Sequence, residues 1–400
     1  AAVCPAIQVD FEDLHQKVFP GQEVTPHGVV ERVVLAQSTT EKRNLRASSG
    51  GLIKELIHHL LAQDDIDGVL ALDEAQGLDY HVRLITHPDE IDQLPGSIYH
   101  AVPLDGTLRL LEENKGRFVI VGIPCQLEGV YNYIFNQAPE LAERIAFTIG
   151  LLCGWLYSHH AVEAISKFKK IDASAITQIS YRGGGPIGKL QISTEEKTTR
   201  IGRRVDFGYQ VAFDRSFNAP RCHLCINHAN FLADLVVGDA WLPSTVTTRT
   251  GVSMVTCRTP EASDLIDALS ESGAIVVAEA TVDELTESQT HRVTFGDFAY
   301  AYADHLDEIG IFRPKMVGPN RELTDLSSPA EASAFHKELT RKRKLQKERR
   351  YRFLWWRKAT RELPRHLRRY FSWFFVRVLR VKSFTKRRKE ISRDSLSGFR

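Results

Sequence analysis

Residues 222–241, CHLCINHANFLADLVVGDAW, decide the fold that we expect for this chain. Their Cys-x-x-Cys pair, Cys222 and Cys225, is followed by an apolar run that closes on Gly-Asp. A short apolar run bounded by turn residues is typical of a strand buried in a sheet. Two thiolates at this spacing can reach one metal centre, so the pair provides half of a binding site. Asp239, which ends the run, is interpreted as a structural residue that caps its turn.

Two cysteines upstream can supply the other half of the site. Cys125 follows the apolar run FVIVGIP, and Cys153 ends the run IAFTIGLLC. Because residues at strand ends stand at the edge of a sheet, where loops converge, we expect both thiols to meet the Cys-x-x-Cys pair. Cys257 lies inside an apolar run without a cysteine neighbour and is predicted to be a core thiol.

The spacing of these cysteines bears on the kind of metal site. Four thiolates fit either a tetrahedral zinc ion or a 4Fe-4S cube. Zinc ribbons usually use two Cys-x-x-Cys pairs, whereas this set has one pair and two isolated cysteines, which is more usual around a cluster. A zinc site remains the alternative. His223 and His228 flank the pair and are interpreted as solvated or supporting groups rather than ligands.

The composition limits the class of protein. The 400 residues are 43% apolar and 26% charged, which allows a large core and two domains with appendages. We find no run of about 18 uncharged apolar residues that would predict a membrane-spanning helix. The N-terminus, AAVCPAIQVD, lacks the features of a secretory signal. Six cysteines are too few for a disulfide scaffold, so we expect a cytoplasmic protein.

The charge is unevenly distributed along the chain. Residues 341–400 contain 23 Lys and Arg against 4 Asp and Glu, while residues 1–340 contain 29 against 46. We therefore expect an acidic body with a basic tail. In residues 341–389 aromatic side chains such as Trp355 and Trp356 alternate with basic ones, which is typical of a helix lying on an anionic membrane. A disordered tail and an acidic protein surface are alternatives, and nucleic acid is not the partner that we expect.

The first half of the chain alternates between strand and helix patterns, which is typical of an α/β sheet with functional loops beyond the strand ends. Strand patterns occur at residues 68–72, 81–85, 117–121 and 144–152. Ser48, Ser49, Gly50 and Gly51 precede a helical pattern at 52–61, where free backbone N–H groups suit a phosphate. A bulky residue at Gly50 should then release the ligand without unfolding the chain. The alternative is a plain helix start whose glycines serve the turn.

A later segment is richer in strands and turns. Residues 175–181 and 188–193 are predicted to pair around the turn GGGP at 183–186. Arg182, beside these glycines, could bind an anionic cofactor, because glycine lets the backbone come close and arginine donates in a fork. A surface hairpin with a solvated arginine is the alternative. Further strands are predicted at residues 253–257 and 274–278, and a helix at 262–269.

These motifs together carry a family resemblance. They are Ser-Ser-Gly-Gly at 48–51, Gly-Ser-x-Tyr at 96–99, Gly-Ile-Pro-Cys-Gln at 122–126, Cys-Gly at 153–154, Tyr-Arg-Gly-x-Gly at 181–185 and the opening stretch at 222–241. In this order they resemble the beta subunits of coenzyme F420-reducing hydrogenases and dehydrogenases, a family that includes 7-hydroxymethyl chlorophyll a reductase. The match covers about residues 1–280, and the ordered set is more specific than any single motif.

The resemblance implies ligands for iron-sulfur clusters. By that resemblance Cys125, Cys153, Cys222 and Cys225 would hold one 4Fe-4S cluster. Cys4 stands in a Cys-Pro pair like the one that closes a ferredoxin-type run. It would be the last visible ligand of a truncated ferredoxin-like segment.

The resemblance also implies an FAD site and a function. Gly96, Ser97 and Tyr99 would lie near the FAD with residues 48–51, and Arg182 is a further candidate. Members pass electrons between clusters and a flavin. We therefore expect a ferredoxin or another redox subunit as one partner and a small-molecule substrate as the other. The alternatives are an electron-relay subunit without activity of its own and a zinc-stabilised binding module.

The expected architecture is an α/β fold with a mixed sheet, a ferredoxin-like N-terminal remnant and a basic helical tail. The tail would place the protein peripherally on the inner face of the membrane. The expected segments are a remnant and connector at 1–40, a flavin-binding α/β part at 41–140, an α/β part with the Cys-x-x-Cys pair at 141–315, a linker at 316–340 and the basic aromatic tail at 341–400.

Overall fold

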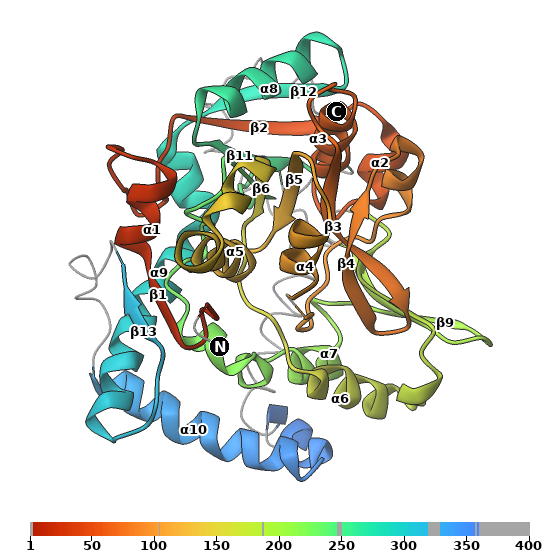
Figure 1. Cartoon of the computed structure of the whole chain (residues 1–400). Helices are drawn as coiled ribbons and strands as arrows, with labels where there is room; N and C mark the ends of the chain where they lie inside the picture. Colours follow the sequence, from red (N-terminus) through yellow and green to blue (C-terminus); the bar gives the residue numbers. More distant parts are fainter. Residues whose placement is uncertain are drawn as a thin grey trace, which may run out of the picture.

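An eight-stranded mixed sheet forms the centre of the molecule (Figure 1). The computed structural model describes residues 3–103, 105–185, 188–245, 250–318, 329–356 and 358–359. The strand order is β12-β2-β11-β10-β6-β5-β3-β4. The bounds are β2 Arg32–Ser38, β3 Gly68–Gln76, β4 Asp79–Ile85, β5 Phe118–Gly122, β6 Ile145–Leu151, β10 Leu235–Asp239, β11 Ser253–Cys257 and β12 Ile275–Ala280. The expected α/β fold with a mixed sheet is confirmed.

The middle of this sheet is parallel and its flanks are antiparallel. β10, β6, β5 and β3 form the parallel part, while β11, β2 and β12 on one side and β4 on the other pair antiparallel. Parallel strands are covered on both faces and therefore read as continuous apolar runs. This explains why the sequences of β5, FVIVG, and β10, LVVGD, predicted strands so clearly.

Helices cover both faces of the sheet. α3 and α8 pack on one face, where Leu56 and Ile266 are fully buried, and α4 and α5 pack on the other, around Leu111 and Leu127. The bounds are α1 Phe11–Val18, α2 Glu41–Arg46, α3 Leu52–Leu61, η1 Pro88–Gln93, α4 Asp105–Glu113, α5 Pro124–Gln137, η2 Pro139–Arg144, α8 Pro260–Glu271 and α9 Val282–Glu308. The helices predicted at 52–61 and 262–269 are confirmed.

A three-stranded antiparallel sheet stands beside the central one and confirms the predicted hairpin. It packs with α6 and α7 around a separate core cluster in which Tyr181 is 1% exposed. The bounds are α6 His159–Lys169, η3 Ala173–Ala175, β7 Gln178–Gly183, β8 Lys189–Ser193, β9 Thr198–Ile201, α7 Phe207–Ala212, η4 Arg215–Phe217 and η5 Pro220–Leu224.

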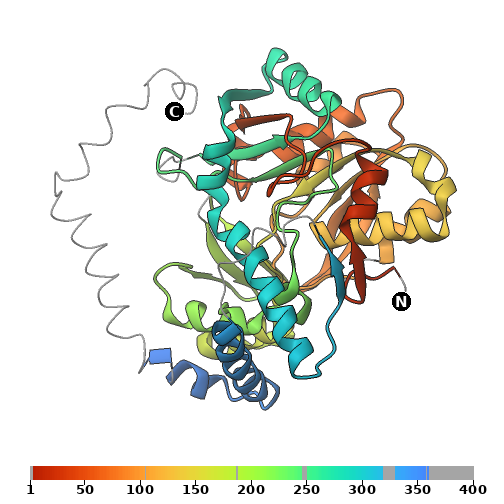
Figure 2. The same ribbon diagram turned by 90° about the vertical axis from the view of Figure 1, so that its left-hand side faces the viewer.

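A segment near the N-terminus pairs with a strand late in the chain, and a helix that follows this strand packs on the body. β1, Gln8–Asp10, pairs in parallel with β13, Lys315–Val317. β2 also falls within the first forty residues but belongs to the central sheet. α10, Pro329–Lys347, begins within the segment expected to be a linker and packs against α9 and η4. Figure 2 shows it at the lower end of the molecule, beside the end of α9.

The start of the basic tail is docked on the body. Tyr351 and Leu354 are buried in the core cluster of the three-stranded sheet, while Trp355 and Trp356 are 40% and 58% exposed. Residues 360–400 lie outside the described part of the chain, and with them most of the predicted amphipathic tail. None of the described helices combines the length and the apolar character that a membrane crossing needs.

Candidate functional site

The four predicted metal-ligating thiols come from three parts of the chain. Cys125 lies in the first turn of α5, Cys153 follows the end of β6, Cys222 lies in η5, and Cys225 caps that turn. Burial raises the pKa of Cys125, and the charges of Glu128 and of the other three cysteines raise it further. Because such charge effects weaken with distance, they indicate that the fold gathers the four thiols in one region.

Backbone hydrogen bonds tie the loops that carry these thiols. The Cys153 N–H donates to the His228 carbonyl at 3.1 Å, and His228 Nδ1 donates to the Cys153 carbonyl at 2.7 Å. The Leu156 N–H donates to Cys222 Sγ at 3.3 Å. His228 therefore supports the Cys153 loop, and its 5% exposure shows that the solvated alternative was wrong for it. That alternative was also wrong for His223, which is 3% exposed.

A buried ion pair stands beside the thiols. Arg221 Nη2 lies 3.4 Å from Glu128 Oε2, and Asn227 Nδ2 donates to Glu128 Oε1 at 3.0 Å. Glu128 is 0% exposed, and burial raises its pKa. Burial also raises the pKa of Cys225 to about 12, while the Arg221 charge acts in the opposite direction. Arg221 is thus placed to stabilise negative charge on the thiol site.

The same arginine holds the N-terminal segment. Arg221 Nε donates to the Pro5 carbonyl at 2.9 Å. Pro5 also approaches α5, where a Cβ added at Gly129 would lie 3.6 Å from Pro5 Cδ. The Cys4-Pro5 pair therefore lies next to the thiol site, with Cys4 itself exposed.

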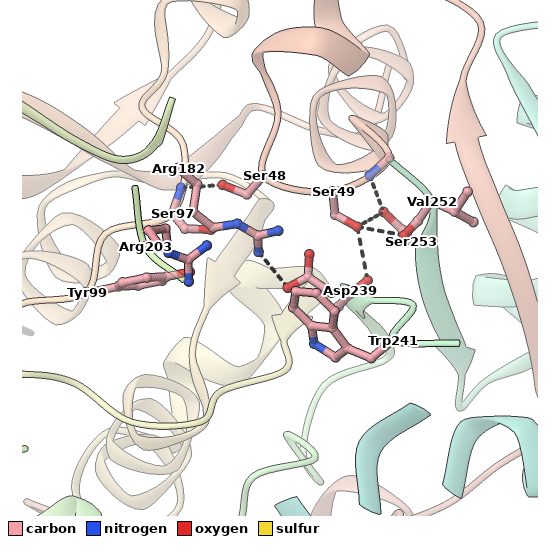
Figure 3. Close-up of polar contacts among 12 residues, drawn as sticks. Ser48, Ser49, Ser97, Tyr99, Arg182, Arg203, Asp239, Trp241, Val252 and Ser253 are labelled. Atoms are coloured by element: carbon pink, nitrogen blue, oxygen red, sulfur yellow. Dashed lines mark hydrogen bonds and ion pairs between the residues drawn. The ribbon is translucent and has the colours of Figure 1, made fainter. Parts of the chain in front are cut away.

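The loops predicted to bind the flavin also meet (Figure 3). The Ser97 N–H donates to Ser48 Oγ at 3.3 Å, and a Cβ added at Gly96 would have only Ser48 Oγ nearby, at 3.5 Å. Ser49 Oγ donates to the Val252 carbonyl at 2.9 Å, which fixes the first loop against β11. Two of the predicted segments, 48–51 and 96–99, therefore form one surface.

Gly50 and Gly51 have structural roles of their own, whether or not a ligand binds beside them. The Gly50 N–H donates to Ser253 Oγ at 3.0 Å, and a Cβ at Gly50 would stand 2.6 Å from the Ala36 carbonyl oxygen. A valine at this position would displace backbone of β2, so the expectation that it leaves the fold intact was wrong. Gly51 adopts a left-handed φ of 76° as the N-cap of α3, which has no side-chain cap.

Arg182 is buried at the edge of the central sheet. It is 5% exposed, and its Nη1 lies 2.6 Å from Asp239 Oδ2, at the end of β10. Its guanidinium carbon lies 5.5 Å from the Trp241 ring centroid. The alternative of a solvated surface arginine was therefore wrong. Asp239, expected only to cap its turn, is the ion-pair partner of Arg182 (Figure 3).

Arg203 belongs to this site but was not predicted. Its guanidinium carbon lies 5.6 Å from the Tyr99 ring centroid, and its Nε donates to the Tyr209 hydroxyl at 3.2 Å. Burial raises the pKa of Tyr209. The sequence signal was the basic pair, Arg203 and Arg204, which the structure places after β9 with one residue between. Two arginines and an aromatic ring thus surround the surface formed by the two loops.

Two family models match the chain, and both describe the beta subunit of coenzyme F420 hydrogenase/dehydrogenase. The model of its N-terminal part matches residues 33–109. The model of its C-terminal part matches residues 115–283. Together the matches cover more than half of the chain. They include Cys125, Cys153, Cys222 and Cys225 as well as the residues predicted to bind the flavin, but not Cys4.

Two curated proteins show how far the similarity extends. One of the subunits of the F(420)H(2) dehydrogenase of Methanosarcina mazei is 23% identical over 204 residues, which are 50% of this chain and 55% of that protein. The beta subunit of the coenzyme F420 hydrogenase of Methanosarcina barkeri is 23% identical over 228 residues, 55% of this chain and 75% of that protein. The chain therefore matches about half of the length of the first and three quarters of the second.

A solved structure has the same fold. A chain of the F420-reducing NiFe hydrogenase complex from Methanosarcina barkeri superposes with a TM-score of 0.57 at 18% identity. The superposition covers 74% of this chain and 98% of that one.

Replacing Arg182 with leucine should destabilise the protein, because it leaves the Asp239 carboxylate without its partner. The two side chains are only 4% and 18% exposed, and breaking a buried pair costs about 3–5 kcal/mol. Chemical denaturation measures the loss. Adding Asp239→Leu to the same chain should recover part of it, whereas purely additive losses would contradict the coupling of the two side chains.

Proposed function

Because this chain belongs to the coenzyme F420 hydrogenase/dehydrogenase beta-subunit family, we propose that it is an iron-sulfur flavoprotein. It would pass electrons between a one-electron carrier, such as a ferredoxin, and a two-electron small-molecule substrate through FAD. The thiol site would hold a 4Fe-4S cluster, and the surface in Figure 3 would hold the flavin.

The observation that carries this proposal is the pairing of β6 with β10. These parallel strands are in register at Leu151 and Val237, and the Leu152 N–H donates to the Val237 carbonyl at 2.9 Å. Cys153 and Asp239 each lie two residues further along their strands. The thiol site and the Arg182–Asp239 pair therefore lie side by side at one edge of the sheet. A cluster and a flavin bound there would be neighbours, as electron transfer between them requires.

The spacing of the thiols, one Cys-x-x-Cys pair and two isolated cysteines, favours a cube over a single zinc ion. In a cube each cysteine would bind a different iron. The Leu156 N–H at Cys222 Sγ and Arg221, whose side chain is 14% exposed, would both favour the reduced, more negative cluster.

The second surface fits a dinucleotide. The N-terminus of α3, which has no side-chain cap, offers N–H groups for the diphosphate. Arg182 and Arg203 supply positive charge, and Tyr99 supplies an aromatic face. Bound FAD would exchange single electrons with the cluster and a hydride with the substrate.

The cluster proposal predicts which cysteines hold iron. Anaerobically purified protein should show flavin and broad brown cluster absorbance, and Cys222→Ser should lose most of its iron and sulfide. Cys257→Ser is the control, because Cys257 is buried in the core at 0% exposure. Full iron content in Cys222→Ser would contradict the assignment. A colourless protein that contains zinc would favour the binding-module alternative.

The flavin proposal predicts that Gly96→Val releases FAD without unfolding. Gly96 is exposed, and an added Cβ meets only the Ser48 hydroxyl, at 3.5 Å, whereas a valine side chain would occupy space beside the diphosphate. Flavin fluorescence after desalting measures the bound FAD, and thermal unfolding checks the fold. Gly106→Val, in the first turn of α4, is the matched control, because an added Cβ there would lie 3.4 Å from Val82 Cβ. A folded Gly96→Val protein with full FAD would place the dinucleotide elsewhere.

A relay subunit within a larger oxidoreductase is a second candidate. The matched relatives are named as subunits, and the superposed structure is a chain of a hydrogenase complex. In this case the same cofactors would be present, but one electron partner would be a neighbouring subunit. Turnover by the purified chain with a small-molecule acceptor would then require that subunit.

We also propose that the basic aromatic tail predicted at 341–389 attaches the protein to an anionic membrane through its residues beyond α10. Exposed Phe353, Trp355 and Trp356 at the start of this segment supply the aromatic groups that such a surface accepts. The full chain should sediment with anionic vesicles at low salt, and a chain ending at Arg352, which keeps α10 but lacks these three aromatic residues, should not. Zwitterionic vesicles are the control. Equal recovery of both chains in the supernatant would end the proposal.

A further inference from the structure

α10 lies outside both family models and covers one side of the thiol site. The ring of Phe335 contacts the ring of His223, which stands between Cys222 and Cys225, at a centroid distance of 5.1 Å. Gln346 Nε2 donates to the Ser216 carbonyl at 3.1 Å. The inner face of the helix is thus bound to the segment that leads into the Cys-x-x-Cys pair.

Two basic side chains strengthen this contact from the same helix. Lys342 Nζ lies 2.8 Å from Asp214 Oδ1, and Arg343 Nη2 donates to the Asn218 carbonyl at 3.3 Å. Arg343 also lies close enough to Cys222 for their charges to interact. Because the helix is fixed by both apolar and ionic contacts, its outer face has a defined position relative to the thiols.

The outer face of α10 is a basic stripe. Lys337, Arg341, Lys344 and Lys347 are exposed and follow one another at spacings of four, three and three residues, so they share one side of the helix. The helix as a whole has six Lys and Arg against two Glu. Its exposed side contains none of the large exposed hydrophobic residues found in the described chain.

We propose that this basic stripe, Lys337, Arg341, Lys344 and Lys347, is the docking surface for an acidic electron-carrier protein that exchanges electrons with the cluster at the thiol site. The inference rests on the proposed function. It adds that the one-electron partner binds at α10 and that the surface of this partner is acidic.

The composition of the stripe favours a protein over the other anionic partners. A helix that enters a membrane interface buries apolar side chains in it, and single-stranded nucleic acid stacks on aromatic rings. The outer face of α10 offers neither kind of group. Complementary charge orients a protein partner on the stripe and raises the association rate. A carrier that must also dissociate after each electron transfer depends on such fast association.

Charge reversal of the stripe tests the proposal. In the triple variant Lys337→Glu, Arg341→Glu and Lys344→Glu, binding of an oxidised plant-type 2Fe-2S ferredoxin, measured by calorimetry at low salt, should weaken by about tenfold or more. Stopped-flow electron transfer with the reduced ferredoxin should slow by a similar factor and lose most of its salt dependence. The three side chains are exposed, and Arg341 pairs with Glu338 on the same helix. Circular dichroism should therefore stay unchanged, and the thermal midpoint should fall only slightly.

A second triple variant separates a local surface from general charge. Lys42, Lys115 and Lys197 are exposed on α2, before β5 and in the β8–β9 turn, away from α10 in Figure 1. Their reversal to Glu changes the net charge equally and should leave ferredoxin binding within about twofold. Equal weakening in both triple variants would overturn the proposal. So would unchanged ferredoxin binding in the α10 variant accompanied by lost binding to anionic vesicles or to an oligonucleotide.

Failure of the proposed function would be seen separately. If the wild-type chain binds neither FAD nor a cluster, the visible spectrum reports it. Calorimetry with oxidised ferredoxin requires no electron transfer, and it would still measure whether the stripe of α10 binds the acidic protein.

Discussion

The close contact between the ends of β6 and β10 is the constraint on which both sites depend. Gly238 lies so near Leu152 that a Cβ at this position would overlap the leucine side chain. Asn230 reinforces the same edge, because its Nδ2 donates to the Gly122 carbonyl at 2.9 Å and to the Leu151 carbonyl at 3.3 Å. One buried amide thus joins the ends of β5 and β6, the two strands that lead to Cys125 and Cys153. The positions at which the chain leaves β5 and β6 toward Cys125 and Cys153 are therefore fixed by the sheet and by Asn230.

Each site also contains a buried arginine-carboxylate pair. Arg221 with Glu128 stands beside the thiols, and Arg182 with Asp239 stands beside the loop surface. Burying such pairs gains little stability, because desolvation offsets most of the attraction. These pairs hold each guanidinium in place, so that it is oriented and partly dehydrated before a negatively charged group binds. An anionic cluster or a diphosphate would therefore bind without the cost of ordering a flexible side chain.

The sequence predicted the strands of the central sheet except β2, and it predicted the side-chain environments less well. The strand at 253–257 has the bounds predicted, and all five of its residues are buried. The burial of Arg182 and His223 could not be read from their neighbours in sequence, since it arises from elements far along the chain. Arg203 follows a four-residue strand, too short for a periodic signal. α10 crosses the boundary expected at residue 340 between the linker and the basic tail, and its packing depends on α9.

The pairing of β1 with β13 has a consequence for the order in which the molecule is built. Residues 8–10 can find their partner only after residues 315–317 have left the ribosome, so the N-terminal segment stays loose during most of synthesis. The central strands β2, β3, β5, β6, β10 and β11 are all made before that point. Arg221 and α5, which lie next to Pro5, are also made before β13, whereas the strand partner of β1 is made only afterwards. The cluster proposed for the thiol site would therefore have an interval for loading before β13 pairs with β1.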